Sequence, residues 1–114
     1  MYSYYVIKGN KWWDLQNVYK SGITNNFLED NDSNILFPTY YVKILKIKTE
    51  DEDKINKELD YLFKQLGLCL VNEEHNFYFK SIEKIVEKYL CDSNIWFEPI
   101  DYNELCTINN IILV

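Results

Sequence analysis

Arginine is absent from this chain of 114 residues, so all twelve of its basic residues are lysines. Arginine is the usual residue for bidentate recognition of phosphate, whereas lysine supplies only a point charge. Eighteen acidic residues outnumber the lysines and give a formal net charge of −6. Because affinity for nucleic acid depends largely on neutralising backbone phosphates, a nucleic-acid partner is disfavoured, although a locally basic face would still allow one.

Cysteine, glycine and proline are also scarce. Cys69, Cys91 and Cys106 are an odd number without a CxxC spacing, which favours reduced core thiols over a zinc ribbon or a closed disulfide framework. Three glycines and two prolines do not form a linker rich in either residue, and no internal repeat is present. We therefore expect one domain with a single core.

Long apolar runs are missing as well. No segment approaches the ~18 apolar residues of a membrane-spanning helix, and the first residues lack the basic region of a secretory leader. We therefore expect no membrane partner and an intracellular, cytoplasmic location. The many Asn, Ile, Lys and Tyr residues would follow from an AT-rich genome, as in some large DNA viruses, where the location would be a virus factory or a virion.

Aromatic residues are abundant, at 17% of the chain, and hydrophobic residues make up 47%. Three segments rich in aromatic and β-branched residues are predicted to be strands, namely Tyr2–Lys8, Leu15–Ser21 (ended by Gly22) and Tyr40–Lys48. Between the first two, the sequence GNKWWD is interpreted as a hairpin loop that presents Trp12 and Trp13.

Two helices are predicted from apolar residues at helical spacing. Thr49 and Glu52 form a capping box ahead of the first helix, which stops at Gly67. Its apolar face comprises Ile55, Leu59, Leu62, Phe63 and Leu66. Ser81 can cap the second helix, whose apolar face comprises Ile82, Ile85, Val86, Tyr89 and Leu90.

The remaining segments carry weaker patterns. Residues 25–34 are interpreted as a short helix or an ordered loop, residues 77–79 as a strand or a packed turn, and residues 103–106 as a short helix. Residues 95–97 and 110–114 are predicted to be extended. The whole pattern predicts a small α/β or α+β domain in which helices pack against a three-stranded, mostly antiparallel sheet, followed by a C-terminal extension.

Two short motifs in the first strands carry a family resemblance. Ser3-Tyr4-Tyr5-Val6-Ile7 and Val18-Tyr19-Lys20-Ser21-Gly22-Ile23-Thr24 stand in order, ahead of the strand YYVKILKI and the acidic start of the first helix. This order resembles the GIY-YIG nuclease superfamily, especially its phage-type and viral branch. The resemblance covers residues 1–90 and leaves residues 91–114 as an extension that packs on the same domain or on a partner.

The resemblance implies a divalent-metal-dependent cleavage of DNA. In such nucleases a tyrosine activates water, an arginine neutralises phosphate charge, and a helix glutamate holds one metal ion. These roles match the needs of an in-line attack on a phosphodiester. Tyr5 matches the tyrosine, and Glu58 keeps the residue type of the metal ligand. Lys20, which stands where the best-known members have a second-motif tyrosine, would have to replace the arginine, and the second motif adds Tyr19, Gly22 and Thr24 as binding residues.

Several positions depart from the family pattern. The arginine should lie a few residues after Thr24, where this chain has Leu28, Glu29 and Asp30, and acids there would repel phosphate. The metal ligand is ambiguous, because Glu58 keeps the residue type whereas the local pattern places the ligand at Asn56. The single histidine, His75, is interpreted as a solvated loop residue, with a general base as the alternative.

Two hypotheses follow. The preferred one is a catalytically degenerate GIY-YIG-like domain without a cofactor, acting as a binding or structural module through a protein partner or self-association. Trp12 and Trp13 are then the candidate contacts, because exposed aromatic residues often anchor protein interfaces. The alternative is an active DNA endonuclease that uses Tyr5, Lys20 and Glu58 with Mg²⁺ or Mn²⁺.

Overall fold

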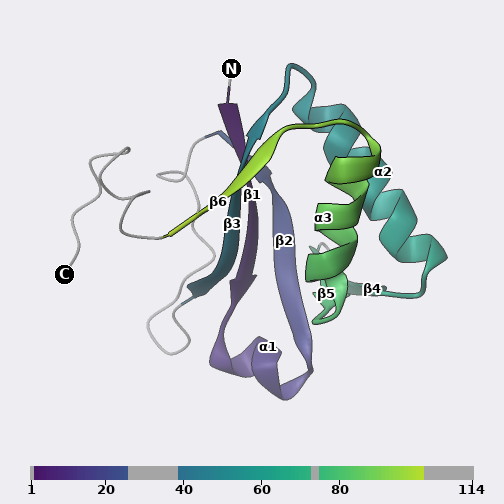
Figure 1. Cartoon of the computed structure of the whole chain (residues 1–114). Coiled ribbons are helices and arrows are strands. Elements are labelled where there is room, and N and C mark those ends of the chain that lie inside the picture. Colours follow the sequence, from purple (N-terminus) through teal and green to yellow (C-terminus); the bar gives the residue numbers. More distant parts are fainter. Residues whose placement is uncertain (1, 26–38, 73–74, 102–114) are drawn as a thin grey trace.

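The described part of the chain forms one antiparallel sheet and three helices, an α+β arrangement. A computed structural model describes residues 2–25, 39–72 and 75–101 (Figure 1). The elements are β1 Tyr2–Gly9, α1 Lys11–Leu15, β2 Val18–Thr24, β3 Tyr40–Lys48, α2 Glu52–Gln65, β4 Cys69–Asn72, β5 His75–Phe79, α3 Ile82–Asp92 and β6 Phe97–Ile100. The expectations for residues 26–34, 103–106 and 110–114 fall outside the described residues.

The sheet is larger than the three strands expected from the sequence. Among the described residues it has six strands in the order β4-β5-β2-β1-β3-β6, and every pair of neighbours is antiparallel. The α+β class and the antiparallel arrangement are confirmed, whereas the strand count was wrong. β4 has only four residues, too few to show an alternating pattern, and β6 contains Pro99, which argues against a strand but is tolerated at a sheet edge.

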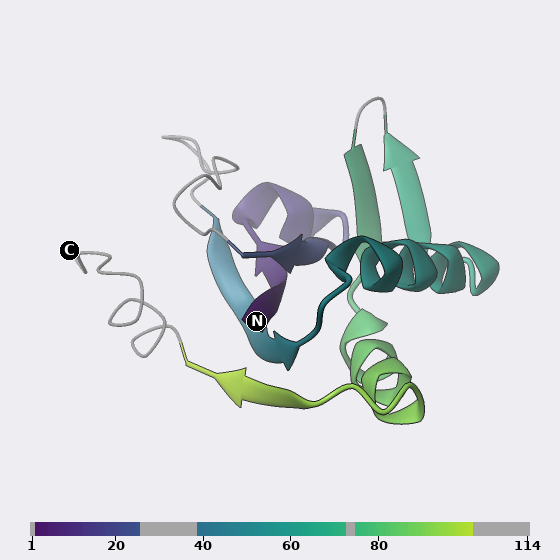
Figure 2. The same ribbon diagram turned by 90° about the horizontal axis from the view of Figure 1, so that it is seen from above.

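The main core lies between one face of the sheet and the helices α2 and α3. Figures 1 and 2 show both helices on the same side of β1 and β3. The buried residues that meet there are Tyr5, Ile7, Leu45, Ile47, Ile55, Leu59, Phe63, Tyr78, Ile82, Val86 and Leu90. A smaller cluster lies on the other face and comprises Tyr4, Val6, Ile44 and Ile100.

Helix α2 follows the predicted periodicity but begins with a different cap. The carboxylate of Asp51 accepts a hydrogen bond from the backbone N–H of Lys54, so Asp51 is the N-cap in place of the predicted Thr49. Thr49 instead accepts a hydrogen bond from the N–H of Asp51. The predicted end at Gly67 is confirmed, since this glycine has a φ of 70°, which favours a residue without a Cβ.

Helix α3 covers the predicted residues and runs two residues further, to Asp92. Ser81 occupies the N-cap position as expected, but its side chain makes no capping hydrogen bond. The helix is held instead by its buried face, where Ile82, Val86 and Leu90 are fully enclosed. Packing of an apolar face contributes more to helix stability in a folded domain than local propensity does.

The segment between the first two strands differs from the predicted hairpin loop. Residues Lys11–Leu15 form a one-turn helix, α1, because the Asn10 side chain accepts a hydrogen bond from the N–H of Trp13. β2 consequently starts at Val18 and continues to Thr24. Gly22 therefore lies inside the strand, opposite Val6, and does not end it as expected.

The two ends of the sheet are attached differently. Two residue pairs, Val18 with Phe79 and Tyr19 with Tyr78, join β5 to β2, and beside them the N–H of Lys80 donates to the carbonyl of Asn17. At the other end β6, which belongs to the part of the chain assigned to the extension, pairs with β3 through four residues. None of the described helices has the length and apolarity needed to cross a membrane.

Candidate functional site

Tyr5, the expected catalytic tyrosine, is part of the main core. Only 2% of it is exposed, and its hydroxyl lies 2.9 Å from the Ser21 hydroxyl, with which it forms a hydrogen bond. Burial raises the pKa of Tyr5, because the phenolate would lose its hydration. A tyrosine that resists ionisation and is closed off from solvent is poorly suited to activate water.

Lys20, the expected substitute for the arginine, points to the other face of the sheet. Opposed residues of an antiparallel pair share a face, and successive residues alternate between faces. Tyr5 opposes Ile23, whereas Lys20 opposes Lys8. Ile23 shares the face of Tyr5, and Lys20 is an odd number of residues, three, before Ile23 in the same strand. The Lys20 side chain therefore extends from the face opposite to Tyr5. The two residues therefore do not meet in one site.

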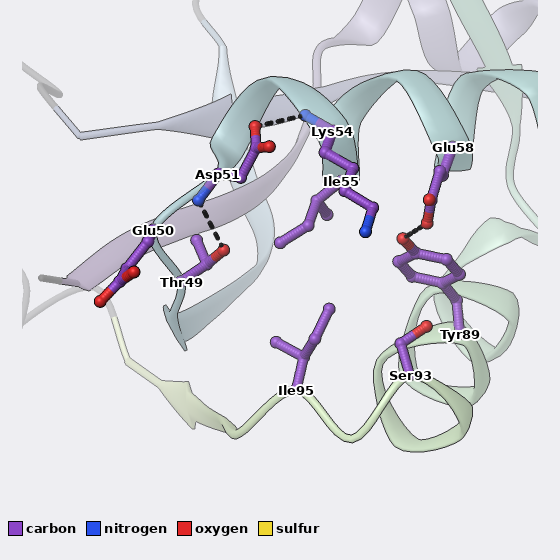
Figure 3. Close-up of a pocket in the computed structure, with 9 residues that line it drawn as sticks. All are labelled: Thr49, Glu50, Asp51, Lys54, Ile55, Glu58, Tyr89, Ser93 and Ile95. Carbon is purple, nitrogen blue, oxygen red and sulfur yellow. Dashed lines mark hydrogen bonds between the residues drawn. The ribbon is translucent and has the colours of Figure 1, made fainter.

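Glu58, the expected metal ligand, lies on α2 and faces α3. Its carboxylate accepts a hydrogen bond from the hydroxyl of Tyr89, and Figure 3 shows the two side chains pointing toward each other. Burial, followed by this hydrogen bond, raises the pKa of Tyr89 to about 12. The Glu58–Tyr89 contact bridges the two helices at one wall of a cleft.

The cleft beside Glu58 has a volume of about 430 Å³ and lies between the start of α2 and the end of α3 (Figure 3). Its lining residues are Thr49, Glu50, Asp51, Lys54, Ile55, Glu58, Tyr89, Ser93 and Ile95. Three of these are acids and one is a lysine, so the cleft would repel a phosphate group. Its size lies within the usual range of small-ligand pockets.

The residues around Glu58 do not fit the single Mg²⁺ or Mn²⁺ ion that the nuclease hypothesis requires. Within the described part of the chain, no three His, Cys, Asp or Glu side chains gather closely enough to hold a metal ion. The Glu58 carboxylate is already engaged by Tyr89. A carboxylate that binds Mg²⁺ would need its oxygen lone pairs directed to the metal and its waters.

Asn56, the other position considered for the metal ligand, is the one that faces the second motif. A Cβ placed on Gly22 would have the Asn56 side-chain oxygen, 4.0 Å away, as its nearest neighbour. This is an ordinary contact distance, and Gly22 is not among the residues with positive φ. The strand therefore has no steric need for glycine at Gly22, and the α2 residue near it, Asn56, carries a neutral amide in place of a carboxylate.

The other residues of the second motif are divided between the two faces of the sheet. Tyr19 packs against the main core, and the Lys80 ammonium lies 5.3 Å from the centre of its ring. Burial raises the pKa of Tyr19. Thr24 opposes Tyr4 and so lies on the other face. His75 begins β5, but its side chain lies outside what the structure describes, as do Leu28, Glu29 and Asp30.

The two tryptophans of α1 have different environments. The Trp13 ring packs on the Phe77 ring, with centroids 5.6 Å apart, which ties α1 to β5. Trp12 is 55% exposed, and Leu15, three residues further along the helix, is also exposed. Residues three apart lie on the same side of a helix. α1 therefore presents a small apolar surface formed by Trp12 and Leu15, called the α1 surface below.

A polar cluster behind α1 was not expected from the sequence. The Asp14 carboxylate accepts hydrogen bonds from the Tyr40 hydroxyl at 2.7 and 2.8 Å and from the Lys80 ammonium at 2.9 Å. The bond from Lys80, followed by the bond from Tyr40, lowers the pKa of Asp14. The bond to Asp14 in turn raises the pKa of Tyr40 to about 12. Asp14 thus connects α1 to β3 and to the start of α3.

A second unexpected group lies beneath α2. Asp60 accepts a hydrogen bond from the Tyr78 hydroxyl at 2.8 Å and forms an ion pair with Lys64 at 3.1 Å. Burial, followed by the bond to Asp60, raises the pKa of Tyr78. Asp60 is one turn after Asn56, and the spacing of the apolar residues alone gave no sign of this role. The group anchors α2 to β5.

Comparison with family models, with curated proteins and with solved structures finds no match for this chain. The likeness to GIY-YIG nucleases therefore depends on the two motifs and on the order of the elements.

Proposed function

We propose that this chain is a catalytically degenerate GIY-YIG-like domain that acts as a protein-binding module. One observation carries the proposal, namely that Tyr5 and Lys20 extend from opposite faces of the sheet. A nuclease must place its general base and its phosphate-neutralising cation around one scissile bond. Two side chains separated by the sheet do not meet that requirement.

The position of Glu58 supports the same proposal. Its carboxylate bonds to Tyr89 in a cleft between α2 and α3, whereas Tyr5 is enclosed beside Ser21. The position that faces the second motif is Asn56, and a neutral amide is a weaker ligand for a hard divalent cation than a carboxylate. The three roles of the nuclease mechanism therefore lack a common site among the residues proposed for them.

The α1 surface is the proposed contact with a partner protein. Trp12 and Leu15 expose apolar area on a helix that is held rigidly from behind by Trp13 and Asp14. A large exposed tryptophan on a fixed backbone is the kind of residue that anchors a protein interface. Of the two tryptophans predicted as contacts, Trp12 is proposed for binding and Trp13 for support.

A plasmid-nicking assay with Mg²⁺ or Mn²⁺ tests the absence of catalysis. The natural chain and the Glu58→Gln variant are both expected to leave supercoiled DNA intact, while a known nuclease in parallel confirms the conditions. Metal-dependent cleavage that is abolished by Glu58→Gln would overturn the proposal and favour the endonuclease.

Partner recovery with tryptophan variants tests the binding role. Trp12→Ala is expected to reduce recovery of a bound protein while leaving the unfolding temperature unchanged. Trp96→Ala, which alters a tryptophan of similar exposure on the chain before β6, is the matched control and should retain binding. Unchanged recovery with Trp12→Ala would remove the α1 surface from the proposal.

A further inference from the structure

The strand β4 ends the sheet with an apolar edge. Among the described strands it pairs only with β5. Leu70 is 42% exposed and Val71 is 68% exposed. Because consecutive strand residues point to opposite faces, this edge exposes an aliphatic side chain on each face of the sheet. Exposed backbone groups beside exposed apolar side chains are a template for pairing with another strand.

The opposite edge of the sheet is protected against such pairing. β6 contains Pro99, which has no N–H to donate, and Glu98, whose charge would face a like charge in a second copy. β4 has neither kind of residue. Figure 2 shows the β4–β5 hairpin beside α2, apart from β1 and β3, so its outer edge does not face the rest of the sheet. The β4 edge can therefore pair with a further strand more readily than the β6 edge can.

The β4 edge lets two copies of this chain approach each other without charge repulsion between the paired segments. The chain carries a formal net charge of −6, so most of its surface would repel another copy. The six residues from Leu66 to Val71, LGLCLV, contain no charged residue. Two copies can approach each other through this segment without placing like charges in contact.

We infer that two copies of this chain associate through β4, with the two strands paired antiparallel across a two-fold axis to give one continuous sheet. A two-fold axis makes the interface isologous, so the same patch is used by both copies. Opposed residues of an antiparallel pair share a face. If the axis passed between two residues, each would oppose a neighbour that points to the other face of the sheet. The axis must therefore pass through a single residue position, and we place it at Leu70 or Val71, so that this residue opposes itself in the second copy.

Analytical ultracentrifugation over a concentration series tests this interface. The natural chain is expected to change from monomer to dimer between about 5 μM and about 500 μM. Val71→Lys should weaken association by at least about tenfold, because the charge enters a two-fold interface twice. Tyr61→Lys, which replaces an apolar residue that is 66% exposed on α2, is the matched control and should associate like the natural chain.

Three outcomes would overturn the inference: a monomer at every concentration, association unaffected by Val71→Lys, or equal weakening by Tyr61→Lys. Amide hydrogen exchange gives a second readout that needs no variant. At high concentration the amides of β4 should exchange more slowly than at low concentration, while those of β6 should not change. Association that leaves β4 exchange unaltered would place the interface elsewhere and refute the inference. The α1 surface plays no part in this test, so its result is independent of the proposed function.

Discussion

The ring of Tyr40 lies over Gly9 so closely that a Cβ at this end of β1 would displace it. A Cβ on Gly9 would lie 2.7 Å from both the Cζ and the hydroxyl oxygen of Tyr40. The same hydroxyl donates to Asp14. The glycine thus allows the ring to cross the strand and reach α1.

Gly9→Ala is expected to displace the Tyr40 ring and break its bond to Asp14. The pKa of Tyr40, about 12 with this bond in place, should fall toward its ordinary value of about 10. Titration by NMR with ring-labelled tyrosine would measure this change. Gly22→Ala is the matched control, since a Cβ there meets its nearest atom at 4.0 Å. An unchanged pKa of Tyr40 in Gly9→Ala would contradict the packing.

Tyr5→Phe removes one hydroxyl of the Tyr5–Ser21 pair while preserving the ring in the core. The variant is expected to lower the free energy of unfolding by about 1 kcal/mol, because the Ser21 hydroxyl loses its partner. Urea denaturation would measure the difference. Tyr61→Phe, at an exposed position of α2, is the control and should be neutral. A loss no larger than that of the control would show that the hydroxyl pair contributes nothing to stability.

Alkaline pH is expected to destabilise the fold. Five tyrosines have raised pKa values, namely Tyr5, Tyr19, Tyr40, Tyr78 and Tyr89. The folded state therefore keeps protons that the unfolded chain loses near pH 10, and the free energy of unfolding should fall as the pH rises above that value. Chemical denaturation at a series of pH values would measure the fall. Stability that stays constant or increases up to about pH 11.5 would oppose the prediction.

Asp14→Asn is expected to reduce stability slightly at neutral pH and not at all in strong acid. The folded-state pKa of Asp14 lies below its ordinary value of 3.8. Its contribution is therefore present above that value and lost as the pH falls through the folded-state pKa. Because the Asp14–Lys80 pair is about one third exposed, solvent screening keeps the effect small. The difference in unfolding free energy between variant and natural chain at about pH 7 and about pH 2 is the measurement. An equal difference at both pH values would show that ionisation of Asp14 is irrelevant.

The helices could be predicted from the sequence because their signals are local. Ile55, Leu59 and Phe63 recur at helical spacing over fourteen residues of α2, and Gly67 marks the end. α1 was missed because one turn is too short to show periodicity. β4 was missed for the same reason. The extended segment predicted at residues 95–97 reached only the first residue of β6, because Pro99 is a poor strand residue except at an edge.

The candidate site was harder to predict because it depends on register. The sequence shows that Tyr5 and Lys20 each lie on a strand, but only the pairing of Tyr5 with Ile23 fixes the faces to which they point. Such pairing is a long-range property, and a shift of one residue would reverse the result. The bonds of Asp14 to Lys80 and of Glu58 to Tyr89 likewise join residues that are distant in the chain.

The six described strands form one sheet, but the number of paired residues differs between neighbouring strands. β1 pairs with β2 through five residues and with β3 through eight, whereas β5 is joined to β2 through two. Segments held by few backbone bonds open at a lower free energy than the global unfolding free energy. The β5–β2 junction should therefore open at a lower free energy than the β1–β2 and β1–β3 pairings, so the β4–β5 hairpin and the other four strands are two units linked mainly by side-chain packing, notably that of Tyr78 in the main core. A partner bound to this hairpin would raise the opening free energy of the hairpin first. Because α2 is anchored to the hairpin through Asp60 and Tyr78, part of that stabilisation would extend to the main core.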